Sequence, residues 1–115
     1  MNDRTKELAI PRRVKEAVAK RDSVQGWPCC IACGLPAPTA NRLAFSCAHY
    51  ISRGQGGLGI EENILTLCPT CHREYDGERR RELRPILERY LREQYPGWDE
   101  SKLYYSKEGE HGNTM

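Results

Sequence analysis

Apolar residues recur with helical spacing near the N-terminal end of the chain. Val14, Ala17 and Val18 lie on one side of such a helix, because residues three or four apart share a helical face. Pro11 is well placed as the first helical residue, where a missing backbone N–H breaks no hydrogen bond. The pattern therefore predicts a helix over residues 11–21.

A second helical pattern lies toward the C-terminal end, within residues 78–95. Its apolar stripe consists of Leu83, Ile86, Leu87, Tyr90 and Leu91. Proline lacks a backbone N–H and clashes with the preceding helical turn, so Pro85 is not expected deep inside a helix. We therefore expect two helices that meet near Arg84, with Pro85 in the first turn of the second.

The segment between these helices contains shorter elements. Residues 22–41 are rich in proline, glycine and cysteine and indicate a turn-rich segment. Aromatic and aliphatic residues predict a strand over 43–51, and a second apolar run covers 64–67. A glycine-rich loop over 54–59 separates the two, and a short helix is expected over 70–76. Short strands with flanking helices are typical of a small α+β fold.

The composition limits the chain to one small domain. It has 115 residues, of which 38% are hydrophobic and 30% charged, and its mean hydropathy is −0.75. Such a chain has little apolar area for a core, so its six cysteines are candidates for additional stabilisation. We expect a single domain over 1–108, with its core over 27–77, and a disordered tail over 109–115 that includes His111.

The sequence also favours a cytoplasmic location. No window approaches the ~20 apolar residues of a membrane span, and the charged start does not resemble a secretory signal. We therefore expect a reducing compartment and no membrane partner. In such a compartment paired cysteines hold metals more often than they form disulfides. The alternative, a secreted disulfide protein, predicts six oxidised thiols and no zinc.

The formal net charge of +2 does not identify a partner by itself. Residues 1–28 hold seven basic and four acidic groups, so this segment carries +3. Arg12, Arg13, Lys15 and Lys20 lie off the apolar stripe of the predicted N-terminal helix. They form either a solvated helix face, which such charge runs favour, or a surface that contacts DNA phosphates.

Four cysteines have the spacing of a metal site. Cys30 and Cys33 form one C-x2-C pair, and Cys68 and Cys71 form another. Each pair bends the backbone into a tight knuckle that points two thiolates at one place, and two knuckles complete the tetrahedral shell that zinc prefers. Zinc there would be structural, because four thiolates leave no open position for water. Metal binding would then be part of folding.

Two further cysteines lie outside this pattern. Cys29 could replace Cys30 as a ligand, although the two-residue spacing of Cys30 is the commoner one. Cys47 precedes His49 by two residues, so both project from the same face of the predicted strand. We interpret Cys47 as a free, buried cysteine; a role beside a metal is the alternative.

Two histidines and an asparagine stand in order within this framework. His49 ends the predicted strand, Asn63 precedes the second apolar run, and His72 directly follows Cys71. The sequence around them reads AHYISRG from residue 48 and ENILTLCPTCH from residue 62. This arrangement closely resembles the HNH endonuclease family over roughly residues 11–76. The resemblance implies a ββα-metal finger, that is, two antiparallel strands and a helix around one divalent ion, stabilised here by the four-cysteine zinc site and flanked by terminal helices.

The resemblance implies roles for individual residues. His49 takes the position of the general base, and an imidazole with a pKa near ~6.5 can accept a proton at neutral pH. His72 and Asp76 share a helix face and take the place of the pair that holds the catalytic ion; the carboxylate suits Mg²⁺ or Mn²⁺. Asn63 would bond backbone near His49 and so hold the base, or it is simply a loop-capping asparagine.

The family resemblance also implies an activity and its setting. We expect an endonuclease that hydrolyses DNA phosphodiester bonds to 5′-phosphate and 3′-hydroxyl ends. The small stand-alone members that the chain resembles come from phages and bacteria, which implies phage or restriction-type protein partners in a bacterial or phage-infected cell. Arg53 would project to a substrate phosphate, or it is a plain surface arginine.

Two features qualify this assignment. Many family members carry Asp or His directly before the base as a further metal ligand, whereas this chain has Ala48. A non-catalytic zinc module that binds nucleic acid or protein is therefore the alternative function. Gly54, Gly56 and Gly59 match the G-x-G-x-x-G dinucleotide motif, but no long helix or βαβ unit follows them. These glycines are expected to let the backbone curl beside the active site.

Overall fold

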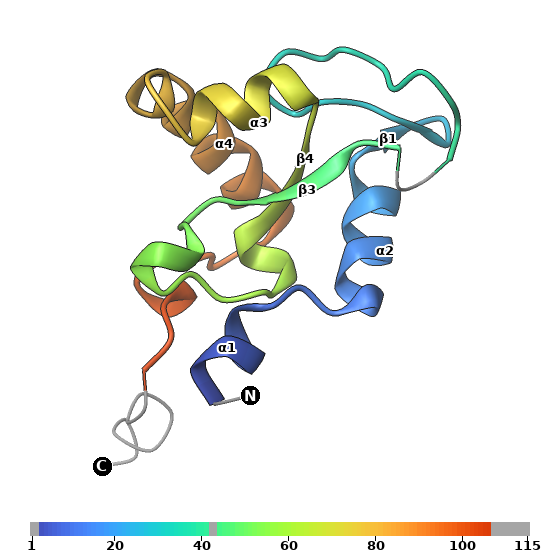
Figure 1. Ribbon diagram of the computed structural model, residues 1–115. Coiled ribbons are helices and arrows are strands. Elements are labelled where there is room, and N and C mark those ends of the chain that lie inside the picture. The colour runs from blue at the N-terminus through green and yellow to red at the C-terminus, as the bar shows by residue number, and fades with distance from the viewer. Residues whose placement is uncertain (1–2, 42–43, 107–115) are drawn as a thin grey trace.

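The computed structural model describes residues 3–41 and 44–106 (Figure 1). Within these ranges, two α-helices precede four short strands, and two further α-helices follow them. The helices are α1 (Asp3–Leu8), α2 (Arg12–Arg21), α3 (Pro69–Tyr75) and α4 (Arg80–Gln94), and the strands are β1 (Ser23–Val24), β2 (Trp27–Pro28), β3 (Ser46–His49) and β4 (Ile64–Leu67). Three single turns of 3-10 helix cover Arg53–Gln55, Glu61–Asn63 and Glu100–Leu103. The observed fold is small α+β, as predicted.

The centre of the fold is an antiparallel pair of strands covered on both faces. β3 pairs with β4 so that Ser46 lies opposite Leu67 and His49 lies opposite Ile64. In Figure 1, α2 lies on one side of this pair and α3 with α4 on the other. All four residues of β4 are buried, which is expected for a strand that packs on both faces.

Alternate residues of β4 belong to two separate cores. Ile64 packs with Val14 and Val18 of α2 in the smaller one. Leu65 and Leu67 point the other way into the main core, whose residues include Leu83, Leu87 and Leu91 of α4 together with the aromatic rings of Tyr50 and Tyr75. The period-2 alternation of a strand thus divides one short apolar run between two helical layers.

The register of β3 and β4 sets the relative position of the histidines. His49 stands at the end of β3 that is next to Asn63, because its pairing partner is Ile64. α3 begins at the opposite end of the pair and runs back toward this end. Its last residue, Tyr75, donates its hydroxyl to the Tyr50 carbonyl at 2.7 Å. The helix therefore places its C-terminal end close to the residue that follows His49.

A buried polar network attaches α2 to β4 and α4. The Asp22 carboxylate, at the end of α2, accepts hydrogen bonds from the Thr66 amide at 2.8 Å and from the Tyr90 hydroxyl at 2.5 Å. Arg21 donates to both oxygens of Asp22 and to the carbonyls of Glu61 and Ile64. These carbonyls flank Asn63 on both sides. The network therefore fixes the segment that carries Asn63.

Most of the predicted elements are present with shifts of a residue or two. The helix expected over 11–21 is α2, with Pro11 as its N-cap rather than its first helical residue. The expected strand over 43–51 is shorter, since β3 covers only Ser46–His49, and Leu43 lies outside the described residues. The helix expected over 70–76 is α3. α1 was not predicted.

The prediction of two helices around Pro85 was wrong. α4 runs unbroken through this proline, which is the sixth residue of the helix. The ring removes one backbone donor, but Leu83, Leu87 and Leu91 are buried on both sides of it, and their packing holds the two parts in line. The apolar periodicity also predicted Ile86 on the buried stripe, but this residue remains 44% exposed.

The described residues end at 106, so the predicted disordered tail over 109–115 lies outside them. Before that, the Trp98 amide donates to the Tyr95 carbonyl at 2.9 Å and closes a turn, with Gly97 in the left-handed region at a φ of 81°. Among the described residues, no helix is both long and apolar enough to cross a membrane.

Candidate metal centre and nuclease site

The four cysteines of the two C-x2-C pairs meet in one cluster. Their sulfur atoms all lie within 4.8 Å of one another, and the Sγ atoms of Cys33 and Cys68 are 3.9 Å apart. A tetrahedral zinc ion with Zn–S bonds of ~2.3 Å requires sulfurs roughly 3.8 Å apart. The donor set and its spacing therefore fit zinc, as predicted from the sequence.

Each knuckle is built by local hydrogen bonds. In the first, the Cys30 amide donates to the Leu35 carbonyl and the Gly34 amide to the Cys30 carbonyl. In the second, Cys68 is the N-cap of α3, and its sulfur accepts from the Cys71 amide at 3.4 Å. Pro69 occupies the first turn of α3, where its missing N–H leaves no bond unmade. The metal-binding turn and the start of α3 are thus one structure.

In the absence of metal, burial favours the protonated thiol of Cys71. Cys30, Cys68 and Cys71 are buried, whereas Cys33 is exposed. Burial, and then hydrogen bonds with the neighbouring cysteines, raise the pKa of Cys71 well above its usual value. Four thiolates cannot share this space without a cation. Metal binding must therefore displace protons from the cluster.

The remaining two cysteines lie outside the cluster. Cys29 is half-buried and donates its thiol to the Trp27 carbonyl at 3.4 Å, so Cys30 and not Cys29 belongs to the four. Cys47 is free and packs beside Val14, Val18 and Ile64, but it is half-buried rather than fully buried as expected. Its half-burial raises the pKa of its thiol. A nucleophilic or ligand role receives no support from this environment.

His49 makes a hydrogen bond that the sequence did not suggest. Its Nε2 lies 2.9 Å from the carbonyl oxygen of Leu8, the last residue of α1. A carbonyl oxygen can only accept, so Nε2 carries the proton and the lone pair of the neutral ring is on Nδ1. Burial lowers the pKa of His49, outweighing the Leu8 bond, which acts in the opposite direction. Burial therefore favours the neutral form of the ring.

Asn63 is fully buried and holds the backbone just after His49. Its Oδ1 accepts from the Ile51 amide at 2.7 Å, and its Nδ2 donates to the carbonyls of Ile51 and Leu58 at 3.1 and 2.8 Å. The Asn63 carbonyl also accepts from the Tyr50 amide at 2.7 Å. This placement is the one expected of a bracing asparagine. The amide ties both ends of the glycine-containing loop to the end of β4.

His72 and Asp76 lie together on α3, as their four-residue spacing predicts. The His72 Nε2 is 3.7 Å from an Asp76 carboxylate oxygen, and its Nδ1 is 2.8 Å from the Ser46 hydroxyl. These residues line an open hollow with Ala44, Pro69 and Arg73. The charges of His72 and Asp76 also act on the pKa of His49, in opposite directions. Ser46 was missed from the sequence because no motif marks it.

Ala48 lies on the face of β3 that packs against α3, and its side chain offers no metal-ligand atom there. Its side chain is buried in the main core, with Cys71 and Tyr75 of α3. The neighbouring Ser46, two residues earlier on the same face, is the polar side chain that reaches His72. A divalent ion at His72 and Asp76 would therefore find no protein ligand at position 48.

The residues that the sequence predicted to contact DNA lie at the surface. Arg12, Arg13, Lys15 and Arg53 are all exposed. Arg12 pairs with Glu16 at 3.0 Å, and Arg13 borders a hollow that also contains Glu61 and Glu62. These carboxylates weaken the positive field of that part of α2. The α2 residues thus lie on a mixed-charge surface, consistent with a solvated helix face.

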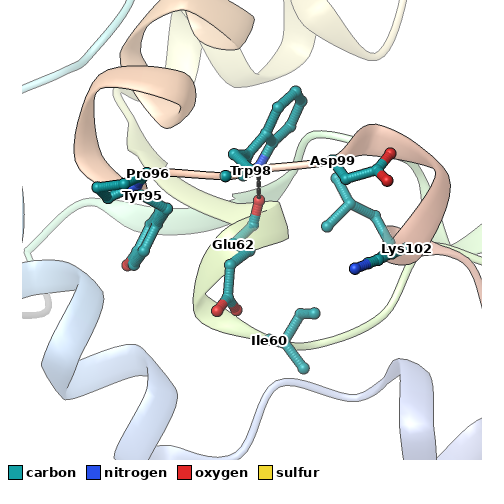
Figure 2. Close-up of a pocket in the computed structure, with 9 residues that line it drawn as sticks. Ile60, Glu62, Tyr95, Pro96, Trp98, Asp99 and Lys102 are labelled. Atoms are coloured by element: carbon teal, nitrogen blue, oxygen red, sulfur yellow. Dashed lines mark hydrogen bonds between the residues drawn. The ribbon is translucent and has the colours of Figure 1, made fainter.

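A separate cavity of about 330 Å³ lies beside the C-terminal turn (Figure 2). Ile60, Glu62, Tyr95, Trp98 and Lys102 are among its lining residues. The Trp98 indole donates to the Glu62 carbonyl at 2.8 Å, the bond drawn as a dashed line in Figure 2. None of the predicted catalytic residues lines this cavity. Trp98 instead anchors the chain immediately before Asn63.

Comparison with known families agrees with this geometry. Residues 30–77 match the family model described as HNH endonuclease, a segment that contains both cysteine pairs, β3, β4 and α3. This segment therefore matches the HNH endonuclease family, and the resemblance read from the sequence is confirmed. No curated protein matches the chain. α1, α2 and α4 lie outside the matched segment.

Proposed function

We propose that the chain is a metal-dependent endonuclease that hydrolyses DNA phosphodiester bonds. The observation that carries the proposal is the placement of His49, which lies in the segment that matches the HNH family and has its Nε2 engaged by a carbonyl. Nδ1 is then the nitrogen available to take a proton from a water molecule. A general base must be unprotonated at working pH, and burial of His49 favours that form.

His72 and Asp76 are the residues that would hold a divalent ion such as Mg²⁺ or Mn²⁺. An imidazole and a carboxylate within 3.7 Å of each other, beside an open hollow, fit the ligand preference of such ions. When bound, the ion would polarise the scissile phosphate and stabilise the departing oxygen. Ser46 orients the His72 ring by its bond to Nδ1 and leaves Nε2 facing Asp76.

The four-cysteine cluster would hold a structural zinc ion. Cys30, Cys33, Cys68 and Cys71 fill a tetrahedral shell, so no position remains for water or substrate. The zinc would tie the turn after β2 to the start of α3, and thereby fix the helix that carries His72. Arg53, exposed beside the His49 loop, is the residue we assign to a DNA phosphate.

One observation favours a second function. Ala48 supplies no ligand on the strand face beside His72, so a domain that binds nucleic acid through its zinc module without cutting it has support from the same structure. The two functions differ in a single measurable property, which is strand cleavage. Cellular partners among phage or restriction-type proteins and a cytoplasmic location remain part of the proposal.

Plasmid nicking separates the two functions. Zinc-loaded protein is incubated with supercoiled plasmid and either Mg²⁺ or Mn²⁺, and the loss of supercoiled form is followed. We expect cleavage by the wild type, a fall of about 10²–10⁴-fold for His49→Ala, and no change for Arg89→Ala, an exposed residue of α4. Wild-type protein that leaves the plasmid intact with both ions would refute the nuclease assignment and leave the binding module.

A further inference from the structure

The N-terminal segment, residues 3–10, lies outside the matched HNH domain and yet supplies the carbonyl that His49 contacts. We propose that this segment positions the base: it holds the His49 ring with Nε2 protonated and directs the Nδ1 lone pair away from the protein. The inference rests on the proposed function for its catalytic meaning. Its geometric content, the fixed state of the His49 ring, can be tested without any activity.

The end of α1 explains why Leu8 can play this part. The last carbonyls of a helix have no partner within the helix, so they are available to outside donors. Leu8 is the final residue of α1, and its side chain is only 2% exposed. The buried side chain anchors the residue while its carbonyl reaches the imidazole. Because the acceptor is a backbone carbonyl, its role depends on where the backbone of residue 8 lies and not on the chemistry of the side chain.

Gly59 fixes that path. Its amide donates to the Glu7 carbonyl at 3.0 Å, and a Cβ atom at position 59 would lie 2.0 Å from the Ala9 carbonyl oxygen. Real Cβ atoms do not approach so closely, so any larger residue must push the N-terminal segment away. The loop that carries Gly59 is in turn held by Asn63 through the Leu58 carbonyl. The segment, the loop and the asparagine thus converge on His49.

Gly57 and Arg4 make further contacts that hold the glycine-rich loop against the backbone after His49 and against the N-terminal segment. A Cβ at Gly57 would lie 1.7 Å from the Ile51 carbonyl oxygen, so the loop packs directly on the backbone that follows His49. The Arg4 guanidinium, on α1, donates to the Arg53 carbonyl at 3.5 Å. The N-terminal segment therefore contacts the loop at both of its ends, and it lies beside the residue assigned to DNA phosphate.

The experiment uses full-length, zinc-loaded protein and two glycine variants. Gly59→Ala introduces the clash with Ala9, whereas Gly54→Ala is the matched control, because its Cβ would meet only the Ser52 hydroxyl at 3.9 Å. Leu8→Ala is a milder perturbation that removes the anchor without adding a clash. Two-bond ¹H–¹⁵N correlation spectra report which ring nitrogen of His49 carries the proton, with the assignment made by loss of the signals in His49→Gln.

We expect a single Nε2-protonated tautomer of His49 in the wild type and in Gly54→Ala. Gly59→Ala and Leu8→Ala should show a mixture of tautomers, with kcat for plasmid nicking lowered at least tenfold in Gly59→Ala and KM little changed. Retained zinc and a cooperative thermal transition identify variants that are still folded. If Gly59→Ala does not fold, Leu8→Ala and the wild-type tautomer decide the matter.

Two results would overturn the inference. One is a wild-type His49 that carries its proton on Nδ1, or that populates both tautomers. The other is folded Leu8→Ala and Gly59→Ala variants with the wild-type tautomer and the wild-type kcat. Failure of the nuclease assignment looks different: the wild type shows the Nε2-protonated tautomer but cuts no DNA with either metal ion.

Discussion

Removal of one zinc ligand should destabilise the fold at least as much as a typical core substitution. Cys68→Ser leaves three thiols where four sulfurs lie within 4.8 Å of one another, while the serine hydroxyl can still accept at the N-cap of α3. The Cys33–Cys68 pair spans 35 positions of the chain. A cross-link over a loop of that length reduces unfolded-state entropy by roughly 4 kcal/mol, and structural zinc contributes ~10–16 kcal/mol in all.

These magnitudes can be compared with the stability of an ordinary domain, which is ~5–15 kcal/mol. A loss of about 4 kcal/mol lowers the Tm of a domain of this size by at least ~15 °C, and complete loss of zinc leaves the fold marginal or unfolded. Cys29→Ser is the matched control, because Cys29 neighbours Cys30 and lies outside the cluster. Its Tm should change by only a few degrees.

The assay combines metal content with thermal unfolding. Zinc per chain is measured by elemental analysis, and unfolding is followed by circular dichroism before and after treatment with a chelator. We expect one zinc per chain for the wild type and for Cys29→Ser, and less than one with a broad transition for Cys68→Ser. A zinc-free wild type that unfolds cooperatively at the same temperature would refute the assignment of the cluster to folding.

Three further outcomes follow from the structure. Leu87→Ala truncates a fully buried residue of α4 and should lower the free energy of unfolding by ~2–5 kcal/mol in urea titrations. Ile86→Ala, at a residue that is 44% exposed, should change the same free energy by about 0.5 kcal/mol or less. Equal losses for the two variants would contradict the observed orientation of α4. The base must be unprotonated and burial lowers the pKa of His49, so log(kcat/KM) should rise with pH, with the midpoint of the rise below pH 6.5; a midpoint above 6.5 would contradict this. Asp76→Asn should raise the Mn²⁺ concentration for half-maximal cleavage about tenfold or more without loss of zinc, and an unchanged metal requirement would remove Asp76 from the site.

The sequence carried enough information to predict the four-cysteine cluster and the position of Asn63. Two cysteine pairs with the two-residue spacing of a metal knuckle bring four sulfurs together, so the four-cysteine cluster can be predicted from the sequence alone. The position of Asn63 beside the turn after His49 also follows, because two apolar runs joined by a loop pair as antiparallel strands. Both predictions rest on the spacing of residues along the chain, which can be read directly from the sequence.

The parts that could not be predicted depend on contacts between distant segments. The Leu8 carbonyl reaches His49 across 41 positions, and a backbone acceptor leaves no mark in a sequence. Ser46 acquires its role only when α3 folds back over β3. Pro85 misled the helix assignment because the local preference of proline was outweighed by burial of leucines on both sides of it. Tertiary packing decided each of these cases.

The central claim is that His49 acts as the base of a DNA-cutting site, and the cleavage rate of His49→Ala tests it most directly. The rate is measured on labelled duplex DNA with saturating Mn²⁺, using zinc-replete wild type and variant at the same concentration. The structure predicts a fall of about 10²–10⁴-fold and partial recovery with added imidazole, which replaces the missing ring. Cleavage by His49→Ala at the wild-type rate would contradict the claim.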